Sequence, residues 1–361
     1  MRQRKKALTP AKENTMNSNY LIRSLILIAG LLFIGATAQA ATTLTSVKTD
    51  KPVLLSGTAD KVWNKAAPLT VKLDNLPYEP SNGYDGMKET TVTMKSLYDD
   101  EYIYFLVQYD DPTESLARFP WVKQQDGTWK QLQKKDSTGH DNTYYEDKVG
   151  IFWNINTDGF TNEGCMIACH MDIEGDTSAG RKFTNKEGET IDMWHVKNVR
   201  TSPLGQVDDQ FVDSTSDGKT NKGWGRKGDV KTGGGYINNV NKDKTAPAYM
   251  NYPASAEAQY YILPSLKTPF VDIFKPGDVV PGIIIDAFQG PRGDIEMRGK
   301  WDNGVWTVEI RRKLVTSGDK ADVQDVQFDD LSKLYHFGIS VFDNSQINHL
   351  YHDETLILKF K

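Results

Sequence analysis

The residues with the clearest chemical potential are two cysteines and the histidine that follows the second one. They lie in the segment Cys165-Met-Ile-Ala-Cys169-His170, which holds both cysteines of the chain. Two thiols followed directly by an imidazole are typical of covalent haem attachment, in which the thiols add to the porphyrin vinyl groups and the histidine binds the iron. The common spacing has two residues between the cysteines, whereas three stand here. We therefore expect one haem c held by Cys165 and Cys169, with His170 as an axial iron ligand.

The first 40 residues have the layout of a secretory signal peptide. Basic residues precede the apolar run Leu25–Ile34, and small residues then lead to Ala38-Gln39-Ala40. The run is about half of the roughly 20 apolar residues that a membrane-spanning helix needs, which argues against an anchor. We expect residues 1–40 to be cleaved and the mature chain to be periplasmic, without a membrane span.

Export also bears on the other interpretations of the cysteine pair. A short disulfide between Cys165 and Cys169, a metal site and two unrelated thiols all remain open. Haem attachment is favoured because it takes place outside the bacterial cytoplasm, where the signal would deliver this chain.

Removal of the signal makes the protein distinctly acidic. The first 40 residues carry six Lys or Arg and one Glu, so the formal charge moves from −5 to about −10. Such a charge disfavours nucleic acid and anionic membrane surfaces as partners, and it suits a basic redox protein.

The pattern of the mature chain indicates short β-strands. Thr91–Leu97 and Tyr102–Tyr109 alternate around the turn signal Tyr98-Asp-Asp-Glu, which predicts a β-hairpin. Further strands are expected at Lys148–Asn156, Gly282–Phe288, Val305–Leu314, Phe337–Asp343 and in the tail His349–Phe360. A short helical turn is expected around Asp192–Val199. The predicted fold is all-β: an antiparallel β-sandwich with long loop insertions and few short helices.

One stretch departs from this pattern. At about 201–247 glycine and polar residues dominate, including Gly233-Gly-Gly235. We interpret it as a polar, Gly-rich insertion that leaves the sandwich, within a single haem-binding domain of residues 41–361.

Several segments, in this order, resemble a known family. They are Val107–Asp111, Glu146–Trp153, Gly164–His170, Asp192–Lys197, Trp301–Arg312 and Phe337–Asp343. The chain is similar to the haem-binding domain of the ethylbenzene dehydrogenase gamma subunit, of the dimethylsulfide dehydrogenase subunit and of c-type relatives (cytochrome c-552/DMSO reductase-like). The resemblance implies a β-sandwich with one haem, acting in periplasmic electron transfer. The gamma subunits bind haem b through methionine and lysine, whereas this chain has the Cys/Cys/His attachment.

The second iron ligand is expected in the tail, where the resemblance implies a late lysine. Here the corresponding stretch, Asn348–His352, offers two histidines instead. Strand parity puts His352 on the same face as Leu356 and Leu358, so His352 is favoured over His349. Met250 is a weaker candidate, followed by His195 and Met171.

Two further residues are assigned to the haem surroundings. Trp194 is expected either to pack on the haem or to lie in the core. Lys197 is expected to pair with a haem propionate or to be a surface charge.

These observations favour a periplasmic monohaem c-type cytochrome that transfers single electrons between redox proteins. The alternatives are a haem subunit of a molybdenum oxidoreductase complex and a haem-based sensor or binding module. The sequence contains no Ser/His/Asp set or phosphate-binding glycine loop, so the polypeptide itself is not expected to be an enzyme.

Overall fold

The computed structural model describes residues 42–170, 181–251 and 260–361. The predicted signal peptide, residues 1–40, and Met171 lie outside the described residues. Contacts within Ala40–Lys361 form one compact unit. In the described part of the chain the α-helices are α1 (Phe160–Glu163) and α2 (Ala321–Gln324), and no helix there is long and apolar enough to cross a membrane.

The predicted hairpin is confirmed. Strand β3 (Thr90–Tyr98) pairs antiparallel with β4 (Tyr102–Asp110). The turn is closed by Asp99, whose carboxylate accepts hydrogen bonds from the backbone N–H groups of Glu101 (2.9 Å) and Tyr102 (2.7 Å). The alternating apolar residues of β4 therefore point to opposite faces, as the sequence pattern requires.

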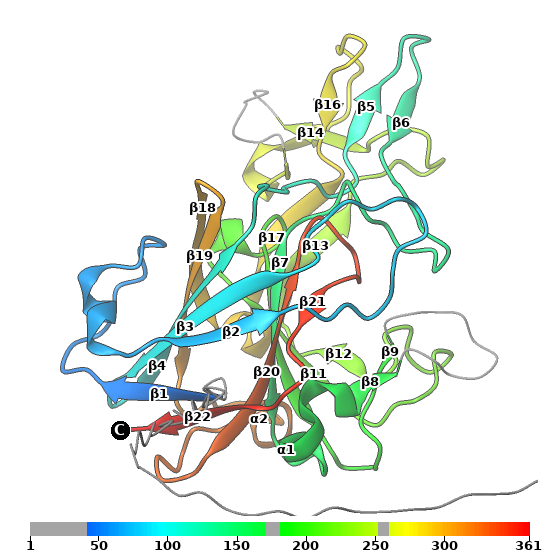
Figure 1. Cartoon of the computed structure of the whole chain (residues 1–361). Helices are drawn as coiled ribbons and strands as arrows, with labels where there is room; N and C mark the ends of the chain where they lie inside the picture. Colours follow the sequence, from blue (N-terminus) through cyan, green and yellow to red (C-terminus); the bar gives the residue numbers. More distant parts are fainter. Residues whose placement is uncertain (1–41, 171–180, 252–259) are drawn as a thin grey trace, which may run out of the picture. The chain divides into compact units, whose positions relative to one another are not determined.

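A 13-stranded sheet forms most of the molecule (Figure 1). Its hydrogen-bonded order is β12 (Arg226–Gly228), β11 (Asp208–Val212), β10 (Ile191–Lys197), β7 (Lys148–Asn154), β20 (Tyr335–Phe342), β22 (Leu356–Phe360), β1 (Thr43–Lys48), β3, β4, β19 (Val305–Lys313) and β18 (Glu296–Asp302). Strands β2 (Leu69–Leu73) and β21 (Leu350–Tyr351) pair with β3 and β20. Strand β1 is parallel to β22 and β3, and the other pairs of this sheet are antiparallel.

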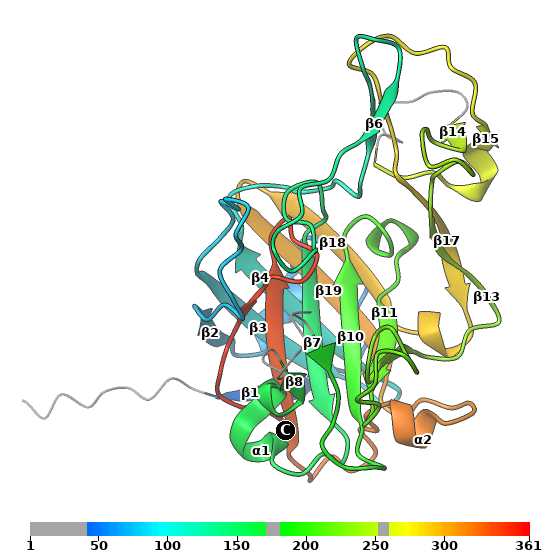
Figure 2. The same cartoon turned by 90° about the vertical axis from the view of Figure 1, so that its right-hand side faces the viewer.

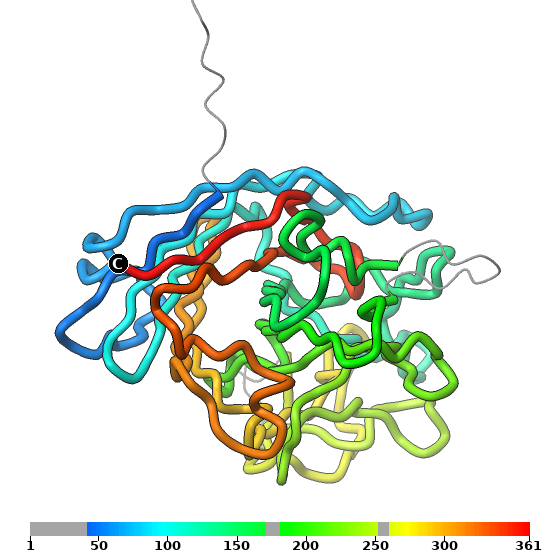
Figure 3. The backbone as a smooth tube through the Cα atoms, turned by 90° about the horizontal axis from the view of Figure 1, so that it is seen from below, coloured from blue at the N-terminus to red at the C-terminus, as the bar shows by residue number. Residues whose placement is uncertain are grey.

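The sheet bends so that one half covers the other. In Figure 2, β20, β7, β10 and β11 lie in front of β3, β4 and β19. Between the two layers Phe105 of β4 packs on Trp153 of β7 (5.5 Å between ring centroids) and on Trp194 of β10 (5.6 Å). Figure 3 shows β22 beside β1, where the layers join. The main core thus lies between the two halves of one sheet, and the predicted β-sandwich is confirmed.

Long connections carry the smaller strands. These are β5 (Trp121–Lys123), β6 (Trp129–Gln131) and β16 (Val279–Val280) in one sheet, β13 (Gly233–Asn238) with β17 (Ile283–Gln289), β14 (Tyr249–Asn251) with β15 (Lys267–Pro269), and β8 (Cys169–His170) with β9 (Arg181–Lys182). Short 3₁₀ helices are η1 (Lys61–Lys65), η2 (Gly164–Ala168), η3 (Ser202–Leu204), η5 (Pro264–Leu266) and η6 (Pro291–Gly293). Strands β5, β6, β14 and β16 lie together beyond one end of the sandwich (Figure 1).

Two expectations about local structure were wrong. The turn expected around Asp192–Val199 is largely strand β10. The stretch at about 201–247 does not simply leave the sandwich, because its strand β11 pairs with β10 inside the large sheet and is buried throughout. The polar composition concealed this strand because Asp208 and its neighbours are buried together with charged partners.

Candidate functional site

Strands β7, β10 and β20 carry a second buried face, opposite to the main core. On β7 the side chains of Val149, Ile151 and Trp153 enter the core, so Lys148, Gly150 and Phe152 point the other way. Segments α1 and β8 lie over this second face (Figure 2). The residues packed there form a separate apolar cluster: Phe152, Phe160, Ala168, Ile191, Met193 and Val212, with Cys165 and Ile167 against it.

Both cysteines open onto a small cavity on this face. Cys165 and Cys169 line a space of about 30 Å³ together with Gly338 of β20 and His349. The two thiols are free, and burial raises the pKa of both. A Cβ atom on Gly338 would lie 3.0 Å from the Cβ of Cys165, so only glycine lets the strand and the cysteine approach this closely.

His349 lines this cavity, and the backbone fixes one nitrogen of its imidazole. Its Nδ1 lies 2.7 Å from the carbonyl oxygen of Ile347, which can only accept, so Nδ1 carries the proton. Burial lowers the pKa of His349 to about 3, so the imidazole is neutral. A neutral imidazole oriented by a backbone carbonyl through one nitrogen has the other available to a metal.

A larger cavity of about 240 Å³ adjoins the cysteine cavity, and Lys182, Met193 and Phe342 line both. Its walls are strongly basic. The cationic side chains are Lys148, Arg181, Lys182, Lys197, Arg200, Lys222 and Arg226. Among the described residues that line it there is no aspartate or glutamate. The cavity therefore suits an anion.

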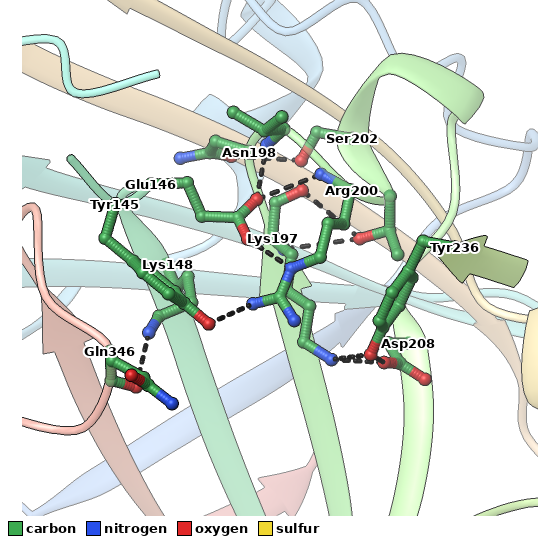
Figure 4. A network of polar contacts seen from close by, with 12 residues as sticks. Tyr145, Glu146, Lys148, Lys197, Asn198, Arg200, Ser202, Asp208, Tyr236 and Gln346 are labelled. Atoms are coloured by element: carbon green, nitrogen blue, oxygen red, sulfur yellow. Dashed lines mark hydrogen bonds and ion pairs between the residues drawn. The ribbon is translucent and has the colours of Figure 1, made fainter. Parts of the chain in front are cut away.

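Two of these cations have carboxylate partners that do not line the cavity (Figure 4). Lys197 pairs with Asp208 and donates to the hydroxyl of Tyr236 at 3.1 Å. Arg200 pairs with buried Glu146, and that carboxylate is also held by the backbone N–H of Arg200 at 2.9 Å. Both cations are thereby fixed in place without a carboxylate entering the cavity.

Lys148 differs from these two. Its ammonium group donates to the carbonyl oxygens of Ser345 (2.6 Å) and Gln346 (3.0 Å), which carry no net charge. Burial and the nearby cation Arg200 lower the pKa of Lys148 well below its usual value. A bound anion at this cavity would relieve that repulsion.

His195 was a minor candidate from the sequence, yet it occupies a central position. It lines the larger cavity, is only 4% exposed, and neither ring nitrogen has a hydrogen-bond partner. Burial and the cations Lys197 and Lys148 lower its pKa well below the usual value. Its two-residue spacing from Lys197 on β10 was the available sequence signal, but it required β10 to be recognised as a strand.

Three other residues singled out from the sequence, His170, Trp194 and Lys197, lie in different surroundings. The Nε2–H of His170 donates to the carbonyl of Phe183 at 3.1 Å and its ring stacks on Phe183, so His170 lines neither cavity. Trp194 is fully buried in the main core, on the other face of β10 from His195, which is the second of the two places expected for it. Lys197 does line the basic cavity.

The two histidines of the tail lie in different places, and the favoured one, His352, lies away from the cysteines. Its Nδ1 lies 3.3 Å from the carbonyl oxygen of Lys72, away from the cysteines, while His349 lines their cavity. The parity argument counted from Leu356 through residues 353–355, but the strand is interrupted there, between β21 and β22. Met250 lies on β14 and lines neither cavity.

The chemistry of these groups fits haem c. Two neighbouring thiols can form thioethers, a neutral imidazole can bind iron, and a basic cavity can hold propionates. His170 is the exception in this arrangement, because its ring does not face the cavity.

Comparisons with known proteins give one family. Residues 60–354 match the family model described as ethylbenzene dehydrogenase. No curated protein matches the sequence.

Solved structures give only distant likenesses. One is a family 9 carbohydrate-binding module from Caldicellulosiruptor kristjanssonii in complex with glucose, with 12% identity, a TM-score of 0.33, and coverage of 88% of this chain and 95% of that one. Another is a putative carbohydrate-binding protein from Bacteroides uniformis, with 10% identity, a TM-score of 0.31, and coverage of 89% and 99%. Superpositions this weak carry no functional argument.

Proposed function

The chain belongs to the ethylbenzene dehydrogenase family, and on this premise we propose that it is a periplasmic monohaem c-type cytochrome that transfers single electrons between redox partners. One observation carries the proposal. One cavity is lined by both cysteines and by His349, which is far from them in the sequence. A basic cavity adjoins it.

Each group has a definite task in this proposal. The thiols of Cys165 and Cys169 would hold haem c covalently. His349 would bind its iron through Nε2, since Nδ1 already donates to the carbonyl of Ile347. His170, which directly follows Cys169, would supply a second imidazole to the iron. Bound haem c supplies a one-electron couple between ferrous and ferric iron.

The basic cavity would hold the negatively charged propionates of the haem. Lys148 and Lys182, which line it, can pair with the propionate carboxylates. The carboxylates that neutralise Lys197 and Arg200 do not line the cavity, so they do not repel a propionate.

The same premise suggests where the protein acts and with what. The family name and the electron-transfer role support a molybdenum oxidoreductase as one redox partner, with this chain as a non-catalytic subunit. The signal-peptide pattern of residues 1–40 supports export to the periplasm. The acidic charge of the mature chain suits basic partner proteins over nucleic acid.

Intact mass of the exported protein tests the proposal. We expect the mass of the chain from about residue 41 plus one haem, which acidic organic solvent does not extract. The double variant Cys165→Ser/Cys169→Ser should lose this covalent haem. A wild-type mass equal to the bare polypeptide, or to the polypeptide with a disulfide, would refute the proposal.

A further inference from the structure

Four buried aspartates converge on the side of β10 and β11 that faces away from the basic cavity. They are Asp192 on β10, Asp209 on β11, Asp229 directly after β12 and Asp325 directly after α2, hereafter the aspartate cluster. Their exposed fractions run from 0 to 4%. One carboxylate oxygen each from Asp209, Asp229 and Asp325 lies within 4.8 Å of the other two.

Hydrogen-bond donors reach only some of the carboxylate oxygens in the aspartate cluster. The Oδ2 atom of Asp192 accepts from the indole N–H of Trp194 (3.0 Å) and from the backbone N–H of Val326 (2.9 Å). The Oδ2 atom of Asp325 accepts from the hydroxyl of Thr316. These bonds fix the orientation of both carboxylates, as outer partners do around a bound metal.

Five of the other oxygens are buried and have no hydrogen-bond partner. They are Oδ1 of Asp192, Oδ1 of Asp229, Oδ1 of Asp325 and both oxygens of Asp209. Asp192 lies near these three carboxylates, since its charge raises the pKa of Asp209 and Asp229. Buried acceptors without donors are rare in folded proteins and indicate a missing partner.

The charge of the aspartate cluster points to the same partner. Arg312 lies 3.8 Å from Asp192 and 3.7 Å from Asp325, both measured to the hydrogen-bonded oxygens. Arg312 therefore pairs with two of the four carboxylates, and the charge of Asp229 also acts on Arg292. Burial and mutual repulsion raise the pKa of Asp192 to about 7 and that of Asp229 to about 9. A divalent cation among the unpaired oxygens would offset this repulsion.

We propose that the aspartate cluster binds one calcium ion. The oxygens without hydrogen-bond partners all belong to carboxylates. Calcium and magnesium bind such oxygens, whereas zinc and copper prefer nitrogen and sulfur ligands. Calcium takes six to eight oxygens in flexible geometry, whereas magnesium keeps most of its water. This site is independent of the haem proposal.

The ion would join segments that also form the haem site. On β10 and β11 the residues that alternate with Asp192 and Asp209 are Met193, His195 and Gln210, which line the basic cavity. Calcium would tie these two strands to the segments after β12 and α2. It would therefore stabilise the strands that carry the wall of the cavity.

Calorimetric titration of the exported holoprotein, stripped with EDTA, tests the site. We expect one calcium ion per chain, weaker binding of magnesium, and a melting temperature that rises by a few degrees at saturating calcium. The Asp209→Asn variant should bind calcium at least about tenfold more weakly, because it loses a charged ligand. Asp243→Asn removes an exposed carboxylate elsewhere and should bind as the wild type does.

The metal-free state separates this proposal from a cluster held together by shared protons. If calcium is the partner, Asp209→Asn in EDTA should be at least as stable as the wild type, since the amide relieves repulsion. Absence of calcium binding by the wild type would overturn the proposal, even if the variant fails to fold. Binding that survives both Asp209→Asn and Asp229→Asn but is lost in Asp343→Asn would move the ion to the other acidic group, Asp111, Asp147 and Asp343, and would also overturn it.

Discussion

Gly338 and Cys165 approach each other so closely that a Cβ atom on the glycine would lie 3.2 Å from the cysteine sulfur. The two residues are far apart in sequence, yet this contact sets the position of the first thiol above β20. The adjacent small residue Ser340 continues the same strand face, and its hydroxyl oxygen would lie 2.8 Å from a Cβ on Gly150.

The Gly338→Ala variant should therefore disturb the cysteine cavity. We expect a loss of about 1–3 kcal/mol in the free energy of unfolding, as for other overpacked sites, and a lower ratio of haem to protein after export. Urea denaturation and the visible spectrum measure the two effects. Gly299→Ala on β18 is the matched control, since the only tight contact of the new methyl would be with the flexible end of Met297, at 3.2 Å. Equal haem content in both variants would contradict the structural role of Gly338.

The axial ligand in the tail can be identified by substitution. His349→Ala should convert a low-spin haem into a high-spin form that binds carbon monoxide, because Nε2 of His349 is lost. His352→Ala should leave the spectrum unchanged, because that side chain lies by Lys72. Absorption spectra with and without carbon monoxide give the answer. If His195→Ala alone opens the iron, the ligand comes from β10 and the assignment of His349 fails. A wild-type protein that is already high-spin would favour the sensor alternative.

The buried imidazole of His195 should make stability depend on pH. Its folded pKa is lowered well below the unfolded value of about 6.5, so below that pH the unfolded chain binds a proton that the folded protein does not. Stability is therefore complete above about pH 6.5 and falls as the pH decreases, by up to about 1.4 kcal/mol per unit for this one group. His195→Gln should remove this part of the slope between pH 6.5 and 5, measured by urea denaturation. Parallel curves for variant and wild type would show that His195 does not titrate differently on folding.

Much of the framework could be predicted from local patterns. The hairpin of β3 and β4 follows from strict alternation around an Asp-rich turn, and β7, β19 and β20 follow from β-branched and aromatic runs. That Cys165 and Cys169 line one cavity follows from their close spacing, so it too could be predicted from the sequence.

The rest depends on contacts between distant segments. Strand β11 is polar because Asp208 pairs with buried Lys197 on one face and Asp209 joins the aspartate cluster on the other, and composition alone makes such a strand look like a loop. The orientation of His349 depends on where β21 stops, which strand parity does not reveal. The basic cavity could not be predicted because its cations, such as Lys148 and Arg226, come from separate strands and gather only in the folded chain.

The parallel pairing of β1 with β22 has a consequence for the order of assembly. Strand β22 is the last strand of the described chain, and β20 beside it carries Gly338. In a chain delivered with its N-terminus first, β20 and β22 arrive late. Until then the two layers of the sandwich are not joined, and Cys165 has no strand to pack on. Pairing across such a sequence separation is slow, because the loop must close before the contacts form. During that delay the two thiols are not yet enclosed by the fold, so the topology itself leaves them accessible to modification before the cavity is complete.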